Sequence, residues 1–302
     1  MAALLVAGVL SACQNGETTK TEEPTVEIMQ KEDPKTDDTI NILMIGNSFS
    51  YYFTDELYGI AKANGVKMRV CNIYASGCTM QQHWEWWKNN QANYTEFTIT
   101  DDSGVKTVNS VTLKYCLEQY NWDVITLQEA SGRVRKNSAE EALNASHTYR
   151  AELYAYLKEQ FPQSRHMWHQ TWAYQVGFTS DSYKVEYTAE QNAYYERMKQ
   201  VAISTCQEFG VERINSGDAW QIARANPVIG DNLCARLSVN NGEGDYYHDG
   251  DIGGGQYLNA CVWFEVITGQ SCVGNTFRPS YDLPEDKIAA LQQTAHQAVA
   301  SR

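Results

Sequence analysis

The sequence is poor in basic residues, with 24 Lys and Arg against 37 Asp and Glu and a net charge of −13 at pH 7. Nucleic-acid binding needs a basic surface to meet the phosphates, so this balance excludes nucleic acid as an expected partner. The eight cysteines form no Cys-x-x-Cys pair, which argues against a zinc ribbon. Beyond the first residues no apolar run is long enough to span a bilayer, and there is no internal repeat.

The length and hydrophobic content of the chain are sufficient for a folded domain. The chain has 302 residues, of which 43% are hydrophobic and 20% are charged. We expect one domain over residues 39–302 with a sizeable core. The 8 Trp and 19 Tyr supply core side chains, and an excess of Trp also suits clefts that stack on sugars.

The N-terminal segment is expected to direct export. An apolar stretch from Ala2 to Val9 precedes Leu10-Ser11-Ala12-Cys13, similar to a bacterial lipoprotein signal that is cleaved before a lipidated cysteine. The usual basic residues before it are missing, so we expect a truncated start. Residues 14–38 are polar and predict a disordered tether. We therefore expect a protein held in the cell envelope, at the periplasm or cell surface, and touching the membrane through the Cys13 lipid only.

Export also bears on the cysteines. It places the protein where disulfides are permitted. Seven cysteines remain after Cys13, an odd number, so at least one stays unpaired or pairs between chains.

Apolar runs alternate with helical patterns after the tether. This alternation predicts a three-layer α/β/α sandwich around a central parallel sheet, as in flavodoxin-like folds. A polar segment at 91–111 predicts a hairpin insertion with its turn at 101–104. Strands are expected at 40–45, 67–74, 123–127, 166–172 and 211–214, and helices at 55–63, 138–159, 186–209 and 257–267, the last ending the fold.

Three predicted strands end in residues that suit a catalytic cleft. Ligands of open α/β sheets sit beyond the carboxyl ends of the strands. The first strand ends at Ser48, the second runs into Gly77, and the third ends at Gln128. Near the other end of the chain, Asp245 and His248 stand three residues apart. Nucleophilic hydrolysis needs a serine, a base that takes its proton, and a carboxylate that orients the base.

In this order the residues resemble the four sequence blocks of the SGNH (GDSL-type) hydrolase superfamily. Those blocks carry Ser, Gly, Asn and an Asp-x-x-His pair, and residues 40–275 fit the layout. Gln128 departs from it, standing where an asparagine is expected. The run 254–260 looks like that of a branch of exported bacterial proteins. The resemblance implies Ser48 as nucleophile, His248 as base, Asp245 as its orienter, and an oxyanion hole from the N–H groups of Ser48 and Gly77 with the Gln128 amide.

Each of these elements also has a simpler interpretation. Ser48 alone could serve as a helix N-cap. The chain lacks the second glycine of Gly-x-Ser-x-Gly, so a lipase-type α/β-hydrolase is not expected. Asp249 and Asp251 resemble the start of a calcium loop, but the twelfth position is Ala260 rather than glutamate. These aspartates more simply begin the last helix, with the neighbouring glycines allowing close backbone approach.

Four further residues are candidates for walls of the cleft, namely His83, Trp84, His169 and Trp172. His166 and His169 do not suggest a metal site, because their spacing on a strand points them to opposite faces. We expect neither a metal nor an organic cofactor. The expected activity is ester hydrolysis, with acetyl or similar acyl groups on carbohydrates as the preferred substrates. The alternative is a carbohydrate-binding lipoprotein that keeps the fold without catalysis.

Overall fold

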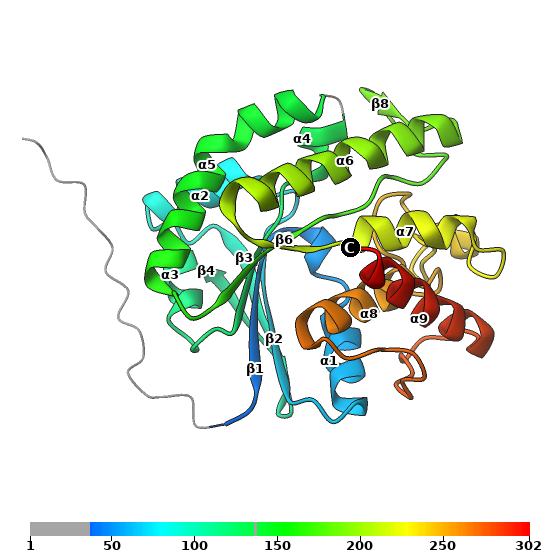
Figure 1. Ribbon diagram of the computed structural model, residues 1–302, viewed down its shortest axis with the longest axis horizontal. Helices are drawn as coiled ribbons and strands as arrows, with labels where there is room; N and C mark the ends of the chain where they lie inside the picture. Colours follow the sequence, from blue (N-terminus) through cyan, green and yellow to red (C-terminus); the bar gives the residue numbers. More distant parts are fainter. Residues whose placement is uncertain (1–36, 136–137) are drawn as a thin grey trace, which may run out of the picture.

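The computed structural model describes residues 37–135 and 138–302 (Figure 1). The expected lipoprotein signal, Cys13 and all but the last two residues of the expected tether lie outside the described residues. Within the described ranges, none of the helices has the length and apolar character needed to cross a membrane.

The centre of the molecule is a mixed seven-stranded sheet with the strand order β4-β3-β2-β1-β5-β6-β9. The pairs β2–β1, β1–β5, β5–β6 and β6–β9 are parallel, whereas β2–β3 and β3–β4 are antiparallel. The sheet is therefore mostly parallel, with one hairpin added at its edge. Its strands are β1 (Ile40–Ile45), β2 (Met68–Tyr74), β3 (Tyr94–Asp101), β4 (Gly104–Val111), β5 (Val124–Leu127), β6 (Arg165–His169) and β9 (Glu212–Ile214).

Helices cover both faces of the sheet, which gives the expected three layers (Figure 1). One face carries α2 and α3, the other carries α1, α7, α8 and α9, and α5 and α6 contribute to both cores. The helices are α1 (Thr54–Ala63), α2 (Met80–Lys88), α3 (Leu113–Leu117), α4 (Ser131–Arg135), α5 (Ala139–Gln160), α6 (Thr188–Phe209), α7 (Ser216–Ala225), α8 (Gly255–Thr268) and α9 (Glu285–Ala300). Two short strands, β7 (Thr179–Ser180) and β8 (Tyr183–Lys184), form a separate hairpin.

Strand β1 shows why two cores form. Its side chains alternate between the faces of the sheet, as in any strand. Ile42 and Met44 pack into the core under α1 and α8, whereas Leu43 and Ile45 pack into the core under α2 and α5. All four are buried, so the strand reads as a continuous apolar run rather than an alternating one.

Several predicted boundaries are confirmed and others need correction. The strand at 40–45 is confirmed, and Ser138 caps α5 through a capping box with Glu141. The hairpin at 94–111 turns at 101–104 as expected, but it extends the main sheet. The expected strand at 166–172 ends at His169, and the fold continues beyond α8 into α9, which the sequence reading missed.

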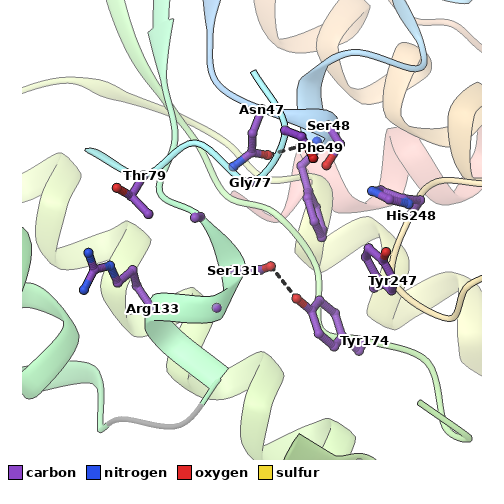
Figure 2. Close-up of a pocket in the computed structure, with 13 residues that line it drawn as sticks. Asn47, Ser48, Phe49, Gly77, Thr79, Ser131, Arg133, Tyr174, Tyr247 and His248 are labelled. Atoms are coloured by element: carbon purple, nitrogen blue, oxygen red, sulfur yellow. Dashed lines mark hydrogen bonds between the residues drawn. The ribbon is translucent and has the colours of Figure 1, made fainter. Parts of the chain in front are cut away.

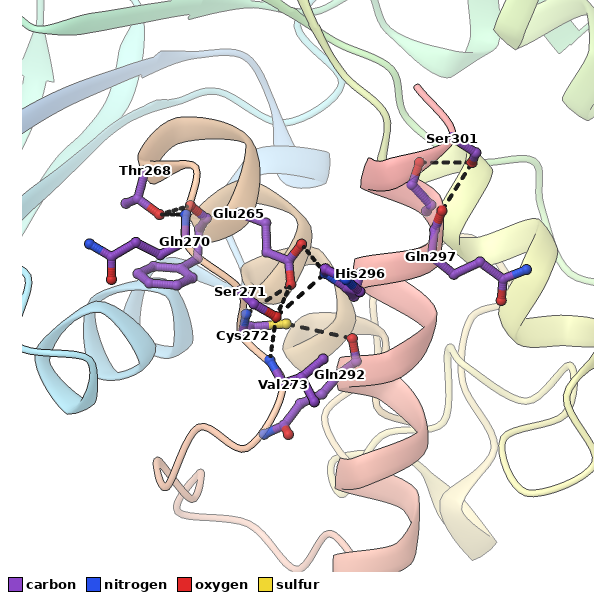
Figure 3. A network of polar contacts seen from close by, with 12 residues as sticks. Glu265, Thr268, Gln270, Ser271, Cys272, Val273, Gln292, His296, Gln297 and Ser301 are labelled. Atoms are coloured by element: carbon purple, nitrogen blue, oxygen red, sulfur yellow. Dashed lines mark hydrogen bonds and ion pairs between the residues drawn. The ribbon is translucent and has the colours of Figure 1, made fainter.

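A polar network ties α8 to α9 (Figure 3). The buried Glu265 carboxylate accepts from the backbone N–H of Cys272 at 2.8 Å and pairs with Nδ1 of His296 at 3.1 Å. The Cys272 thiol points to the carbonyl of Gln292 at 3.6 Å. This cysteine, like the six others in the described part of the chain, is a free thiol.

Candidate active site

Ser48 lies where β1 ends and a 3-10 turn over Ser48–Ser50 begins. The N-cap of this turn is Asn47, whose side-chain oxygen accepts from the backbone N–H of Phe49 at 3.1 Å. The capping role that Ser48 itself could have played therefore belongs to Asn47. Ser48 lines the neighbouring pocket, although the residue is only 7% exposed.

Two neighbouring strands hold this turn in place through buried amides. From β2, Asn72 donates to the carbonyl of Ser50 at 2.8 Å. From the tip of β5, Gln128 Nε2 donates to Oδ1 of Asn47 at 2.7 Å. Asn47 Nδ2 in turn donates to the carbonyl of Cys78 at 3.0 Å, which fixes the loop after β2 against the nucleophile turn. Three strand tips are thus joined around Ser48.

Asp245 and His248 form a hydrogen-bonded pair within one tight turn. One carboxylate oxygen faces Nδ1 of His248, and the other accepts from the backbone N–H of His248 at 2.8 Å and of Tyr247 at 3.2 Å. Burial works to raise the pKa of Asp245, but the hydrogen bonds and charge of His248 with the backbone N–H groups outweigh it, so this pKa lies below its usual value. Asp245 is therefore ionised at neutral pH and holds Nδ1 of the imidazole, while Nε2 makes no hydrogen bond to the described residues.

Contacts with neighbouring segments place the turn that carries His248. Trp172 Nε1 donates to the carbonyl of Tyr247 at 3.1 Å, and the backbone N–H of Gln175 donates to the carbonyl of Tyr246 at 2.7 Å. Tyr246 has a φ of 67°, a left-handed conformation that a bulky residue adopts only where its surroundings hold it. Local strain is thus part of how His248 is presented.

The glycines around this turn have a packing reason. A Cβ at Gly244 would lie 1.8 Å from the carbonyl oxygen of Cys234, and one at Gly250 would lie 2.1 Å from that of Ala235. The glycines let the loop approach the backbone at 234–235 closely, as the sequence predicts for Gly250. They support the site without entering it.

Ser48 and His248 line the same pocket, which has a volume of about 450 Å³ (Figure 2). In the close-up, His248 extends from its loop toward the side of the pocket that carries Ser48. No hydrogen bond joins the two side chains within the described residues, so the expected contact of roughly 2.6–3.2 Å is not formed. The pocket is lined by Asn47, Ser48, Phe49, Ser76, Gly77, Thr79, Ala130, Ser131, Gly132, Arg133, Tyr174, Tyr247 and His248.

Gly77 supplies the backbone expected at an oxyanion site. It occupies the third position of a turn closed by a hydrogen bond from the N–H of Cys78 to the carbonyl of Ala75 at 3.2 Å. Its φ of 61° is the left-handed value that favours glycine at this position. The turn, loop and cap hydrogen bonds of the described residues use neither the N–H of Gly77 nor that of Ser48. Both groups therefore remain available to a ligand in the pocket.

Gln128 is placed differently from the sequence expectation. Its side chain is 1% exposed and is not among the residues that line the pocket. The amide donates to Asn47 and its oxygen faces Nδ1 of His169 at 3.2 Å. The longer glutamine side chain reaches under the nucleophile turn instead of into the cleft. Among the described residues, the hydrogen bond from Gln128 to Asn47 links this side chain to the turn that carries Ser48.

The four residues expected as cleft walls are all placed outside the pocket. His169 and His83 are fully buried, and burial lowers the pKa of each to about 3, so both imidazoles are neutral. Trp84 donates to the Glu152 carboxylate at 2.8 Å beside α5. Trp172 stacks on Trp220 at a centroid distance of 4.3 Å. These aromatic side chains pack in or against the two hydrophobic cores, one on each face of the sheet, and so do not line the pocket.

The walls of the pocket come from other residues. Phe49, Tyr174 and Tyr247 form its aromatic side, and the Ser131 hydroxyl is hydrogen-bonded to that of Tyr174 at 2.6 Å. Arg133 is the residue of fixed positive charge at its rim (Figure 2). Phe49 and Tyr247 could have been found from the sequence as direct neighbours of Ser48 and His248. Tyr174 could not be found in this way, because the strand before it was predicted to run to residue 172, whereas it ends at His169.

Comparison with other proteins agrees with this architecture. Residues 41–298 match the family model DUF4886, described as a domain of unknown function. No protein with a curated description matches the sequence. A crystal structure of a DUF4886 family protein from Bacteroides uniformis is similar, with 29% identity, coverage of 87% of this chain and 95% of that chain, and a TM-score of 0.75.

Weaker similarity extends to hydrolases of known structure. An acetyl xylan esterase has 10% identity, coverage of 75% of this chain and 99% of that one, and a TM-score of 0.46. A GDSL-like lipase from Bacteroides thetaiotaomicron has 10% identity, coverage of 76% and 88%, and a TM-score of 0.41. The match over residues 41–298 shows that this chain belongs to the DUF4886 family.

Proposed function

We propose that the protein is a serine esterase of SGNH type. The observation that carries the proposal is that Ser48 and the paired His248 line one pocket although they are 200 residues apart in sequence. The ionised Asp245 holds Nδ1 of the imidazole and leaves Nε2 toward the pocket. This arrangement supplies a nucleophile, a base and an orienting carboxylate.

The chemistry follows from these positions. Ser48 Oγ attacks the ester carbonyl carbon while His248 Nε2 takes the hydroxyl proton. The backbone N–H groups of Ser48 and Gly77 stabilise the oxyanion. The carbon–oxygen bond to the alcohol then breaks, and His248 returns the proton to the leaving oxygen. Water attacks the acyl-serine with His248 again as base, which releases the acid and restores Ser48.

We further propose that the ester is an acyl group, acetyl first, on a carbohydrate. The pocket combines aromatic faces from Phe49, Tyr174 and Tyr247 with hydroxyl and backbone groups. Aromatic faces stack on the apolar faces of sugar rings, and the polar groups can bind their hydroxyls. Release of acetate from acetylated xylo-, cello- and chito-oligosaccharides, compared with longer-chain 4-nitrophenyl esters, tests this class. Faster cleavage of long-chain esters than of every acetylated sugar would contradict it.

A non-catalytic, carbohydrate-binding role is the second candidate. Two observations favour it: the Gln128 amide does not face the pocket, and Ser48 and His248 make no hydrogen bond in the part of the chain that is described. Apo catalytic hydrogen bonds are often long, so these observations do not outweigh the pairing of Asp245 with His248. A protein that binds an oligosaccharide but releases no acetate would support this role.

A further inference from the structure

A second cavity, of about 770 Å³, runs beside α1 and the segment that precedes α9. It shares no lining residue with the catalytic pocket. Its wall nevertheless touches that pocket, because Tyr52 lines the cavity and its ring lies edge-on to the His248 imidazole at a centroid distance of 5.1 Å. The guanidinium carbon of Arg236 lies 4.2 Å from the centroid of the Tyr52 ring, which gives this ring a second contact.

Three polar side chains that line this cavity have few or no protein partners. Glu56 is 7% exposed, and apart from the Tyr281 hydroxyl its Oε2 has no partner among the described residues. The buried Tyr281 hydroxyl likewise has only Glu56 beside it. The Gln256 side-chain amide makes no hydrogen bond among the described contacts. Buried polar groups are normally satisfied, so a carboxyl and a phenol that have only each other, beside an amide without a partner, point to a ligand that supplies further bonds.

The charged neighbours do not meet this need. Lys62 is bound to Asp102 at 3.0 Å and to the Tyr58 hydroxyl at 3.2 Å, and Arg278 is bound to Glu285 at 2.6 Å. Glu56 is buried away from water, and this burial raises the pKa of its carboxyl to about 7. Within the described ranges no group of three His, Cys, Asp or Glu residues could hold a metal ion, which disfavours a cation site.

Aromatic faces complete the cavity. Phe277 lies against α1 at Gly59, where a Cβ would be 2.1 Å from its ring, so the glycine inside the helix makes room for it. The Phe277 ring is parallel to that of Tyr257 within 3°. Tyr52 and Tyr58 provide further aromatic wall. Fixed aromatic faces beside a carboxyl, an amide and a phenol match a ligand that is apolar on its ring faces and hydroxylated at its edges.

We propose that this cavity is a sugar subsite, which binds the glycan on the alcohol side of the ester past Tyr52. Glu56, Gln256 and Tyr281 bind hydroxyl groups, and Phe277 and Tyr58 flank the ring. The assignment to the alcohol side rests on the proposed esterase function, but the binding of a sugar does not. Neutral oligosaccharides suit the site, since their hydroxyls both donate to the carboxyl and accept from the amide and the phenol.

The test is calorimetric titration of the full chain with xylotriose, cellotriose and chitotriose. The wild type is expected to bind at least one of them saturably. Glu56→Gln and Tyr281→Phe should each weaken that binding about 10-fold or more, because each loses a buried hydrogen bond. Glu140→Gln, an exposed change on α5, serves as the matched control. Tyr281→Phe keeps the test decisive if Glu56→Gln does not fold.

Kinetics separate this proposal from the esterase proposal. Glu56→Gln should raise KM for the acetylated form of the bound oligosaccharide about 10-fold relative to its KM for 4-nitrophenyl acetate. If the protein has no esterase activity but binds a sugar, and Glu56→Gln weakens that binding, the subsite proposal stands and the esterase proposal fails. Hydrolysis of both esters with no trisaccharide binding, or binding unchanged in both variants, would overturn the subsite.

Discussion

Gln128 and Asn47 are joined side chain to side chain, with Gln128 Nε2 donating to Asn47 Oδ1 at 2.7 Å. Asn47 directly precedes Ser48 and caps the turn that presents it. Oε1 of the same glutamine accepts from Nδ1 of His169 at 3.2 Å, and the other ring nitrogen of His169 faces the Ser216 hydroxyl at 3.0 Å. A buried chain of amide and imidazole groups therefore runs from the tip of β5 to the nucleophile turn.

This chain makes Gln128 a positioning residue. Gln128→Met keeps the side-chain volume but removes one hydrogen bond from Asn47 Oδ1 and one from His169 Nδ1. We expect the free energy of unfolding to fall by about 1–3 kcal/mol and kcat to fall with it, since Ser48 loses its support. Urea unfolding together with ester hydrolysis measures both.

Gln297→Met, on the exposed side of α9, is the control for that change. Its stability and turnover should stay within about 0.5 kcal/mol of the wild type. A Gln128→Met protein with unchanged stability and a kcat reduced by about 10²–10³ would instead identify Gln128 as a direct oxyanion donor.

The Asp245 carboxylate is expected to act through the tautomer of His248. Asp245→Asn can still accept from the backbone N–H groups at 247 and 248, so the turn should survive. Its amide cannot hold Nδ1–H as a carboxylate does, and kcat should fall by about 10²–10⁴ with a small change in Tm. Asn109→Asp, on the exposed strand β4, is a control for charge change. Near wild-type kcat in Asp245→Asn would show that His248 is oriented by other contacts.

The sequence predicted the elements whose signals are local. Ser138 and Glu141 specify a capping box, and β1 is an apolar run bounded by turn residues, so both were found at their true positions. The approach of Ser48 to His248 followed from strand order and block order. Gln128, His169 and Trp172 were misplaced because the direction of a side chain at a strand tip depends on packing against distant elements. Tyr174 and the Glu56 cavity depend on loops whose course no local pattern specifies.

Glu56 should make stability depend on pH. Burial raises its pKa from 4.5 to about 7, so the folded state holds a proton that the unfolded state has lost between these values. The stabilising contribution is present below about pH 4.5 and is lost as the pH rises through about 7. Glu56→Gln cannot titrate. Its stability relative to the wild type should therefore increase by about 2–3 kcal/mol between pH 5 and pH 8, measured by urea unfolding.

Glu140→Gln gives the comparison for this pH series, because Glu140 is exposed on α5. The difference in the free energy of unfolding between Glu140→Gln and the wild type should be the same at pH 5 and pH 8. If Glu56→Gln also shows the same difference at pH 5 and pH 8, the carboxyl is not kept from solvent as the structure places it.

The N-terminal segment carries a separate prediction. Leu10-Ser11-Ala12-Cys13 followed by a polar tether is expected to yield a protein lipidated at Cys13. Metabolic labelling with a fatty acid in the native host should mark the wild type and not Cys13→Ser, which should also leave the membrane fraction. Cys206→Ser, a change at a thiol within the folded part, is the control. Equal membrane association of Cys13→Ser would contradict the anchor.

Hydrolysis of 4-nitrophenyl acetate shows whether Ser48 is the nucleophile of an esterase. Wild-type protein and Ser48→Ala are compared at pH 7.5, with Ser182→Ala, an exposed serine in the turn between β7 and β8, as control. We expect turnover by the wild type and by Ser182→Ala, and none above the spontaneous rate by Ser48→Ala at an unchanged Tm. Equal hydrolysis by the wild type and Ser48→Ala, or none by either, would contradict the account.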